Sequence, residues 1–275
     1  MKRPAFATHQ TGLTLVELLV AMTLVATLTA GGLATYIRVT AAWRLQAADQ
    51  RRHERGQYVF GTLEPELQMA GYFGATRPAP VLSAATVPPS VRSCGTDLIT
   101  RLDRPVEKLS SLPAGCVARG VLLAGSDVLV VRRLSARVGA PRPGRAQWLI
   151  PVGAARNGAL RWDGQIPADY TGAEVRDLIV RIYYVARSAD GDARTPALRV
   201  KSLTEVAGVP AFVDTEVMPG VEALAVELLP QASPRSVHIA LRVRADAADT
   251  DAAETGRALP LARQFTLRNA LPWPT

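Results

Sequence analysis

The sequence predicts an α+β protein in which one long N-terminal helix precedes a mostly antiparallel β-sheet head. Three observations predict this fold class. Residues 13–37 are almost continuously apolar, no strong helix breaker follows them before Pro65, and the runs rich in β-branched residues lie after residue 126. Helical and strand patterns do not alternate along the chain, which argues against a parallel sheet. The 275 residues suffice for one domain or two small ones.

The composition is that of a globular chain with a basic surface. Apolar residues make up 48% of the chain and charged residues 20%, which is not typical of disorder. The net charge of +8 and the pI of about 10.1 are compatible with binding to nucleic acid or to an anionic membrane. The arginines are spread along the whole chain and often alternate with apolar residues, so a solvated basic surface is favoured.

The N-terminal segment is the most informative part of the sequence. Residues 1–12 contain Lys2 and Arg3 and no acidic residue, and Glu17 is the single charged residue within residues 13–37. About 20 apolar residues let a helix cross a bilayer core. The threonines of this segment are expected to bond to carbonyls of the preceding turn, which makes them tolerable in lipid. Residues 13–37 are therefore predicted to form a transmembrane helix.

Three interpretations of this segment compete. A cleaved secretory signal would use the small residues Ala30-Gly31-Gly32 as its cleavage site, but the apolar run continues past them. A signal anchor explains the length and the positive leader, because Lys and Arg stay on the cytoplasmic side. Neither explains Glu17, because an unpaired carboxylate in lipid costs at least about 2.5 kcal/mol. A third interpretation must supply a partner for this carboxylate.

The residues from Gly12 to Val20, G-L-T-L-V-E-L-L-V, resemble the N-terminal motif of type IV prepilins and type II secretion pseudopilins. The resemblance implies that a dedicated aspartic peptidase cuts between Gly12 and Leu13 and that Leu13 is then N-methylated. Glu17, the fifth residue of the mature chain, would pair with the N-terminal amine of a neighbouring subunit. The chain departs from the family at Leu13, where Phe is commonest. A glycine before the cut allows an extended strand to enter the peptidase cleft closely.

The helix is expected to continue through residues 38–71 and to pack on the head. One apolar face is formed by residues spaced four apart: Val59, Leu63 and Leu67. Residues 49–57 are polar on all sides and predict an exposed neck. Pro65 is expected to bend or interrupt the helix, and Gly71 to end it.

The head, residues 72–275, begins with a proline-rich connection and the two cysteines of the chain. Four prolines predict an extended surface segment over residues 76–93. In an exported protein, Cys94 and Cys116 would form a disulfide whose pairing has no ambiguity. Such a bridge contributes about 3 kcal/mol in the chain-entropy treatment. The alternative is two free buried thiols.

Six strands are predicted in the head from apolar alternation and β-branched content. They span residues 127–133, 177–187, 196–203, 220–229, 236–244 and 259–269. Residues 188–192 predict the turn between the second and third of them. The alternation of apolar and polar residues over 236–244 is typical of a half-buried antiparallel strand.

No catalytic site can be assembled from the sequence, so a non-enzymatic protein without cofactor is predicted. The three histidines lie in the leader, in the polar neck and on a polar strand face: His9, His53 and His238. No nucleophile–base set, zinc-protease pattern or nucleotide-binding glycine pattern is present. The acidic residues 246–254 offer oxygen ligands, but their spacing does not match a calcium loop, so a solvated loop is favoured over a metal site.

Five head segments resemble PilW-type minor pilins and their J-type pseudopilin counterparts. They are A-G-Y-F-G at 70–74, S-D-V-L at 126–129, I-Y-Y-V at 182–185, P-G-V-E at 219–222 and R-Q-F-T-L-R-N at 263–269. The resemblance implies a minor pilin that joins other minor pilins in a tip or initiation complex and promotes pilus assembly and twitching motility. The implied partners are other minor pilins, the prepilin peptidase, the inner-membrane assembly platform and a tip adhesin.

The same resemblance implies a location and leaves alternatives open. The chain would cross the bacterial inner membrane once, with its head in the periplasm, and would then enter the pilus fibre at the cell surface. A J-type pseudopilin of a type II secretion system has the same architecture. The basic charge also permits DNA capture during uptake, which salt-dependent binding would reveal. A signal-anchored periplasmic enzyme is disfavoured because no site residues were found.

Overall fold

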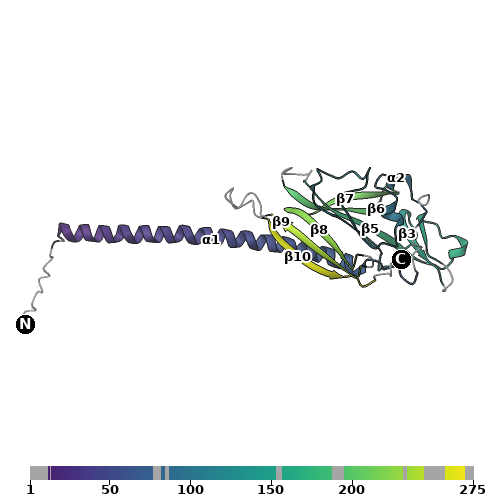
Figure 1. The fold of residues 1–275 in the computed structure, drawn as a ribbon, viewed down its shortest axis with the longest axis horizontal. Coiled ribbons are helices and arrows are strands. Elements are labelled where there is room, and N and C mark those ends of the chain that lie inside the picture. Colours follow the sequence, from purple (N-terminus) through teal and green to yellow (C-terminus); the bar gives the residue numbers. More distant parts are fainter. Residues whose placement is uncertain are drawn as a thin grey trace, which may run out of the picture. The chain divides into compact units, whose positions relative to one another are not determined.

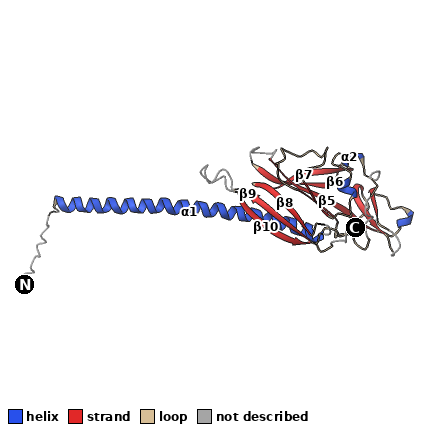
Figure 2. Cartoon of the chain, in the orientation of Figure 1, coloured by secondary structure: helices blue, strands red, loops and turns tan. Residues whose placement is uncertain are grey.

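The computed structural model describes residues 12, 14–76, 82–83, 87–152, 157–187, 195–231, 234–244 and 258–269. The chain divides into two compact units, residues 1–48 and residues 49–275. Its longest element is helix α1 (Leu15–Met69), and the strands follow it in sequence (Figures 1 and 2). All strand pairings are antiparallel within the described residues, so the predicted α+β fold class is confirmed.

The second unit contains two antiparallel sheets. The larger sheet has the order β1-β2-β5-β3-β4, and β6 pairs with both β5 and β7. Its strands are β1 (Val106–Leu109), β2 (Val128–Leu134), β3 (Pro143–Ile150), β4 (Ala159–Asp163), β5 (Glu174–Arg187), β6 (Pro196–Val206) and β7 (Val209–Pro219). The smaller sheet has the order β10-β9-β8, with strands β8 (Val221–Leu229), β9 (Ser236–Val243) and β10 (Leu259–Thr266). Within the described residues there are also three short helical turns: α2 (Pro89–Arg92), α3 (Asp97–Thr100) and η2 (Ala168–Tyr170).

All six predicted strands are present, and they correspond to β2, β5, β6, β8, β9 and β10. The predicted turn at 188–192 lies outside the described residues, but Arg187 pairs with Pro196, as expected for neighbouring strands joined by a short connection. Four strands were not predicted. Two of them, β3 and β7, contain prolines at or near their ends, and β1 and β4 are four and five residues long. Strands that are this short, or that contain proline, do not show a clear alternation of apolar and polar residues in the sequence.

Two hydrophobic cores lie on opposite faces of the larger sheet, because successive side chains of a strand point to opposite faces. On β2, Leu129 and Val131 belong to the first core, whereas Val128 and Val130 belong to the second. The first core also contains residues of α1 and of all three strands of the smaller sheet. The predicted apolar face of the helix is confirmed, since Val59, Leu63 and Leu67 are fully buried there. Each such side chain contributes about 1.5–3 kcal/mol when it is buried.

Two expectations for the second half of α1 require correction. Of the two outcomes expected at Pro65, a bend or an interruption, the interruption does not occur: the helix continues to Met69, with Leu63 and Leu67 held in the core. The segment 49–57 is not exposed on all sides. Arg52 is buried and forms an ion pair of 2.6 Å with Asp49, and a side chain at Gly56 would collide with Leu261 of β10.

The helix end at Gly71 is set by close packing. Gly71 has a φ of 79°, a conformation that other residues adopt at a cost. A Cβ at this position would lie 2.4 Å from the carbonyl oxygen of Asn269. The Gly71 amide donates a hydrogen bond of 3.0 Å to the carbonyl of Arg132 in β2. The glycine that was expected to end the helix therefore also lets the chain leave α1 beside the larger sheet.

Between α1 and β2, the connection is fastened by a buried arginine. Arg132 is fully buried, and its guanidinium donates to the carbonyls of Leu98 and Arg104 at 2.7 Å each. It also forms an ion pair of 2.7 Å with Glu107 of β1. These bonds satisfy a charge that would otherwise be costly to bury, and they hold α3 and β1 against β2.

Cys94 and Cys116 are joined by a disulfide and are both buried in the second core. The segment between them was expected to be loop-like, but it contains α3 and β1. Replacement of both cysteines by serine is expected to lower the free energy of unfolding by about 3 kcal/mol, mainly because the unfolded chain gains freedom. Urea unfolding of the oxidised and variant proteins measures this difference. Native exported protein whose two thiols react with an alkylating reagent would contradict the bridge.

A second group of buried charges joins β6 and β7. Arg199 and Lys201, both largely buried, each lie 2.8 Å from a carboxylate oxygen of Asp214. The hydroxyl of Tyr184 also donates to Asp214, and Arg199 reaches Glu216 at 3.1 Å. Burial alone would raise the pKa of Asp214, but the bonds from Lys201, Tyr184 and Arg199 outweigh burial and lower this pKa below its usual value.

This lowered pKa predicts a loss of stability in acid. The carboxyl of Asp214 has a pKa of about 3.9 in the unfolded chain and a lower pKa in the folded one, so the unfolded chain binds the proton more readily. Its contribution to the free energy of unfolding is present above pH of about 4 and is lost as the pH falls through the folded-state pKa. Urea unfolding at a series of pH values is expected to show a weaker acid dependence for Asp214→Asn than for the wild type. Equal slopes for both proteins would contradict this assignment.

Candidate membrane and assembly segment

The first turn of α1 is closed by a reciprocal pair of side chains. The backbone amide of Glu17 donates to the hydroxyl of Thr14 at 3.3 Å, and the backbone amide of Thr14 donates to the Glu17 carboxylate at 3.1 Å. The Thr14 hydroxyl also donates to the same carboxylate oxygen at 3.0 Å. This is a capping box, in which residues three apart satisfy amides that the helix leaves unpaired. Thr14 therefore acts as the N-cap of α1, and Glu17 lies where the helix dipole favours negative charge.

A local sequence pattern indicates this cap, although the cap was not among the predictions from the sequence. The pattern T-x-x-E at 14–17, directly before an apolar run, is the local signature of a capping box. Glu17 was expected to have a role toward a neighbouring subunit, and the structure gives its carboxylate a role within its own chain as well. In the part of the chain that the structure describes, only Oε2 of Glu17 receives hydrogen bonds. Its other oxygen, Oε1, is therefore available to a donor from outside the chain.

The helix behind the cap presents an apolar surface on all sides. Large apolar side chains from Leu15 to Leu45 are exposed, and Leu15 and Leu28 reach 76% and 74% exposure. An 18-residue stretch of this helix is long and apolar enough to cross a membrane, and none of it is buried in the structure. So much apolar surface is unfavourable in water and requires lipid or neighbouring helices around it.

The hydroxyls of this segment are satisfied within the helix, as expected. Thr23 donates to the carbonyl of Val20 at 2.8 Å, and Thr27 donates to the carbonyl of Leu24 at 2.9 Å. Thr29 and Thr35 bond to carbonyls of their preceding turns in the same way. No hydroxyl among these threonines is left without an acceptor, so the threonines do not prevent the segment from lying in lipid.

The predicted site residues are placed as follows. Gly12 is described and exposed, and apart from its chain neighbours no atom of the described residues lies within 4 Å of a Cβ built on it. Leu13 and the acidic residues 246–254 lie outside the described residues. Nδ1 of His53 lies 3.0 Å from the carbonyl oxygen of Asp49, to which it donates in the tautomer that carries the proton on Nδ1, and His238 lies on β9. The described residues contain no group of three or more His, Cys, Asp or Glu side chains that could hold a metal.

Residues 8–33 match the family described as the prokaryotic N-terminal methylation motif. The chain carries a prepilin-type N-terminus. The match spans the residues on both sides of the Gly12–Leu13 bond, the capping box and more than half of the apolar segment. The prepilin-type N-terminus and the apolar helix behind it fit a membrane-anchored protein of the type IV pilin-like superfamily. No curated protein sequence and no solved structure matches the chain.

Proposed function

We propose that this protein is a minor type IV pilin of the PilW type, structural and non-catalytic, which joins other minor pilins in a pilus-tip or initiation complex. The observation that carries the proposal is the prepilin-type N-terminus, with a capped glutamate at the start of an exposed apolar helix. This arrangement suits a helix that lies first in a membrane and then among the helices of a fibre.

The chemistry of assembly follows from the first residues of the mature chain. Cleavage between Gly12 and Leu13 creates an amine four residues before Glu17. A carboxylate among apolar helices is stable only when it is paired, because its desolvation is otherwise uncompensated. Oε1 of Glu17, which has no donor among the described residues, would accept the amine of a neighbouring subunit. Pairing of this kind would select the axial position at which a new subunit enters the fibre.

The charge at the N-terminus supports an orientation in the membrane. Lys2 and Arg3 precede the apolar helix and would stay on the cytoplasmic side of the inner membrane. The head would then lie in the periplasm until the subunit moves into the fibre and reaches the cell surface. The prepilin peptidase, the inner-membrane assembly platform, other minor pilins and a tip adhesin are the proposed partners.

The assignment to the W type is supported by where its resembling segments lie. Gly71, from the first segment, ends α1 in close contact with Asn269 from the last. Asp127, from the second, donates its amide to the carbonyl of Leu224 in β8 at 2.7 Å. Tyr183 and Val185, from the third, are buried in the first core. The segments therefore include contacts that join α1 and the two sheets, which is where a shared head architecture would require particular residues.

The leader cleavage provides the first test. Gly12→Val is expected to block processing, because a branched side chain obstructs an extended strand in the peptidase cleft. Mass spectrometry of the wild type should find a mature chain that begins with N-methylated Leu13, whereas the variant should retain residues 1–12. Ala7→Val, a matched change within the leader, should be processed normally. A mature wild-type chain that begins near Gly32 would instead indicate a secretory signal and contradict the proposal.

A deletion strain separates the two candidate machines. Loss of surface pili, restored by the wild-type gene and not by the Gly12→Val gene, would support a minor pilin. Normal pili together with a loss of secreted enzymes would support the J-type pseudopilin, which the same N-terminal motif and helix favour equally.

A further inference from the structure

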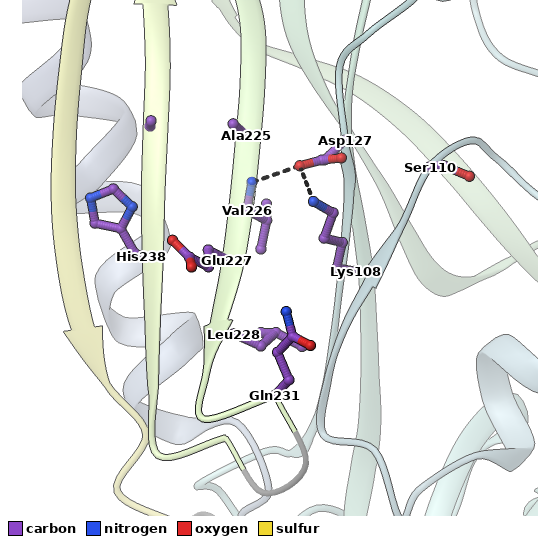
Figure 3. Close-up of a pocket in the computed structure, with 10 residues that line it drawn as sticks. Lys108, Ser110, Asp127, Ala225, Val226, Glu227, Leu228, Gln231 and His238 are labelled. Atoms are coloured by element: carbon purple, nitrogen blue, oxygen red, sulfur yellow. Dashed lines mark hydrogen bonds and ion pairs between the residues drawn. The ribbon is translucent and has the colours of Figure 1, made fainter.

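The edge strands of the two sheets, β1 and β8, face each other without pairing. β8 is hydrogen-bonded to β9 on one side, and β1 is hydrogen-bonded to β2 on one side. Between their outer edges lies an open groove with a volume of about 730 Å³ (Figure 3). Its lining includes Lys108, Asp127, Val226, Glu227, Gln231 and His238.

The chain itself covers the first part of the β8 edge. The backbone amide of Leu224 donates to the Ser126 hydroxyl at 3.0 Å, and the carbonyl of Leu224 accepts a bond of 2.7 Å from the Asp127 amide. The amide of Val226 donates to the Asp127 carboxylate at 2.8 Å. These three bonds show that the backbone polar groups of Leu224 and Val226 point away from β9 and toward the groove.

The second part of the edge is open. Backbone groups that point away from a partner strand recur at every second residue of an antiparallel strand, so the carbonyl of Val226 and both polar groups of Leu228 also point toward the groove. Among the residues that the structure describes, none bonds to these three groups. A row of unpaired strand-edge groups beside an open groove is a template for an added strand.

The side chains beside this open edge favour a basic partner. Glu227 is exposed on the outer face of β8 and lies opposite His238 of β9, as Figure 3 shows. The described residues provide no ion pair for Glu227, whereas Lys108 is already held by Asp127 at 2.9 Å. Ala225 and Ala240 lie opposite each other on the same face and leave room for a long side chain. An added strand would thus meet an unneutralised carboxylate in a chain that is otherwise basic.

We propose that the groove between β1 and β8 binds an extended segment of a different subunit. This segment pairs with the open edge at Val226–Leu228 and places a Lys or Arg side chain against Glu227. The proposal rests on the proposed assembly function and names the surface through which the head would contact a sibling subunit. A second copy of this chain is the less favoured occupant, because two positively charged copies repel each other: the net charge is +8 for the full chain and +6 without Lys2 and Arg3 of the leader.

The test uses the mature full-length chain in detergent micelles and a blocked peptide of sequence T-K-V-K-V-T. Hydrogen exchange of the Leu228 amide, followed by NMR, is the first measurement. At a peptide concentration about ten times its Kd, exchange is expected to slow about tenfold, because the amide then exchanges only from the free fraction. The peptide T-E-V-E-V-T, with the charge reversed, is expected to leave the exchange unchanged. Equal effects of both peptides, or no effect of either, would overturn the proposal.

Variants of the groove provide the second measurement, peptide binding by fluorescence anisotropy. Leu228→Pro removes the amide that points into the groove and no bond to β9, so it should weaken binding of the lysine peptide at least about tenfold. Leu228→Ala also removes the branched end of the leucine side chain but keeps the amide, so it should bind within about twofold of the wild type. Glu227→Lys reverses a charge on the exposed face, so this variant should bind the glutamate peptide more tightly than the lysine peptide. It tests the proposal even if the proline variant does not fold.

The experiments distinguish a failure of the groove proposal from a failure of the proposed pilin function. Peptide binding is measured without pili, so its failure would reject the groove while the results for leader cleavage and piliation would stand. Conversely, normal pili in the deletion strain would contradict the proposed function and would leave the peptide result intact. Self-association of the wild type that Leu228→Pro abolishes would overturn the choice of partner and assign the groove to a second copy.

Discussion

A subunit with Glu17→Ala is expected to be cleaved largely as the wild type is, but to be largely missing from sheared pili. In the proposed function, the cut at Gly12–Leu13 lies four residues before this side chain, whereas entry into the fibre would need the carboxylate to accept the amine of a neighbour. With alanine at this position, that amine would be buried without a partner, which costs several kcal/mol. Immunoblots of sheared pili and of membranes, compared between variant and wild type, measure the incorporated fraction.

The capping box requires a control that separates the two roles of Glu17. Thr14→Ala removes the hydroxyl that bonds to Glu17 and keeps the carboxylate. Loss of an N-cap side chain costs about 1 kcal/mol of helix stability, so this variant should still enter pili in substantial amounts. Recovery of Glu17→Ala at the wild-type level would reject the pairing between subunits. Equal losses for both variants would show that the cap, and not the pairing, is what assembly needs.

Replacement of Glu66 by alanine is expected to lower the free energy of unfolding by about 3–5 kcal/mol. Glu66 lies in the last part of α1, with its side chain 6% exposed. Arg133 of β2 binds both of its carboxylate oxygens, at 2.9 and 2.8 Å, and Arg181 of β5 donates a further bond of 2.9 Å. Alanine would leave Arg133, itself mostly buried, without its partner, and an uncompensated buried charge accounts for the large effect.

Glu64→Ala is the matched control, two residues away on the same helix. The side chain of Glu64 is 45% exposed and lies 3.6 Å from Arg263, so its loss should change stability by less than about 1 kcal/mol. Urea unfolding at neutral pH compares the two variants with the wild type. Similar values for Glu66→Ala and Glu64→Ala would show that the buried carboxylate does not fasten α1 to the larger sheet.

The parts of the fold that the sequence predicted are those governed by local patterns. The alternation in β9 could be read directly, because residues two apart share a face of a strand. The apolar spacing of Val59, Leu63 and Leu67 likewise follows from helix geometry alone. The prepilin-type motif is contiguous, so its residues needed no knowledge of the fold.

The features that the sequence did not predict depend on residues far apart in the chain. Arg132 interrupts an apolar strand, which suggests an exposed position. It is nevertheless fully buried, because carbonyls of α3 and of the loop after it accept hydrogen bonds from its guanidinium. Glu66 and Arg133 are 67 positions apart, and no local pattern indicates that they meet. The groove beside β8 exists only because the edges of two separate sheets come together, so it could not be inferred from either strand.

The cap at the start of α1 has a consequence for maturation. The bonds that begin the helix run between Thr14 and Glu17 and from the Leu18 amide to the Thr14 carbonyl, all on the retained side of the scissile bond. Removal of residues 1–12 therefore takes away none of these bonds. A peptidase that cuts at this proposed bond would therefore leave the first turn of α1 intact, and the helix start would not have to form anew after cleavage.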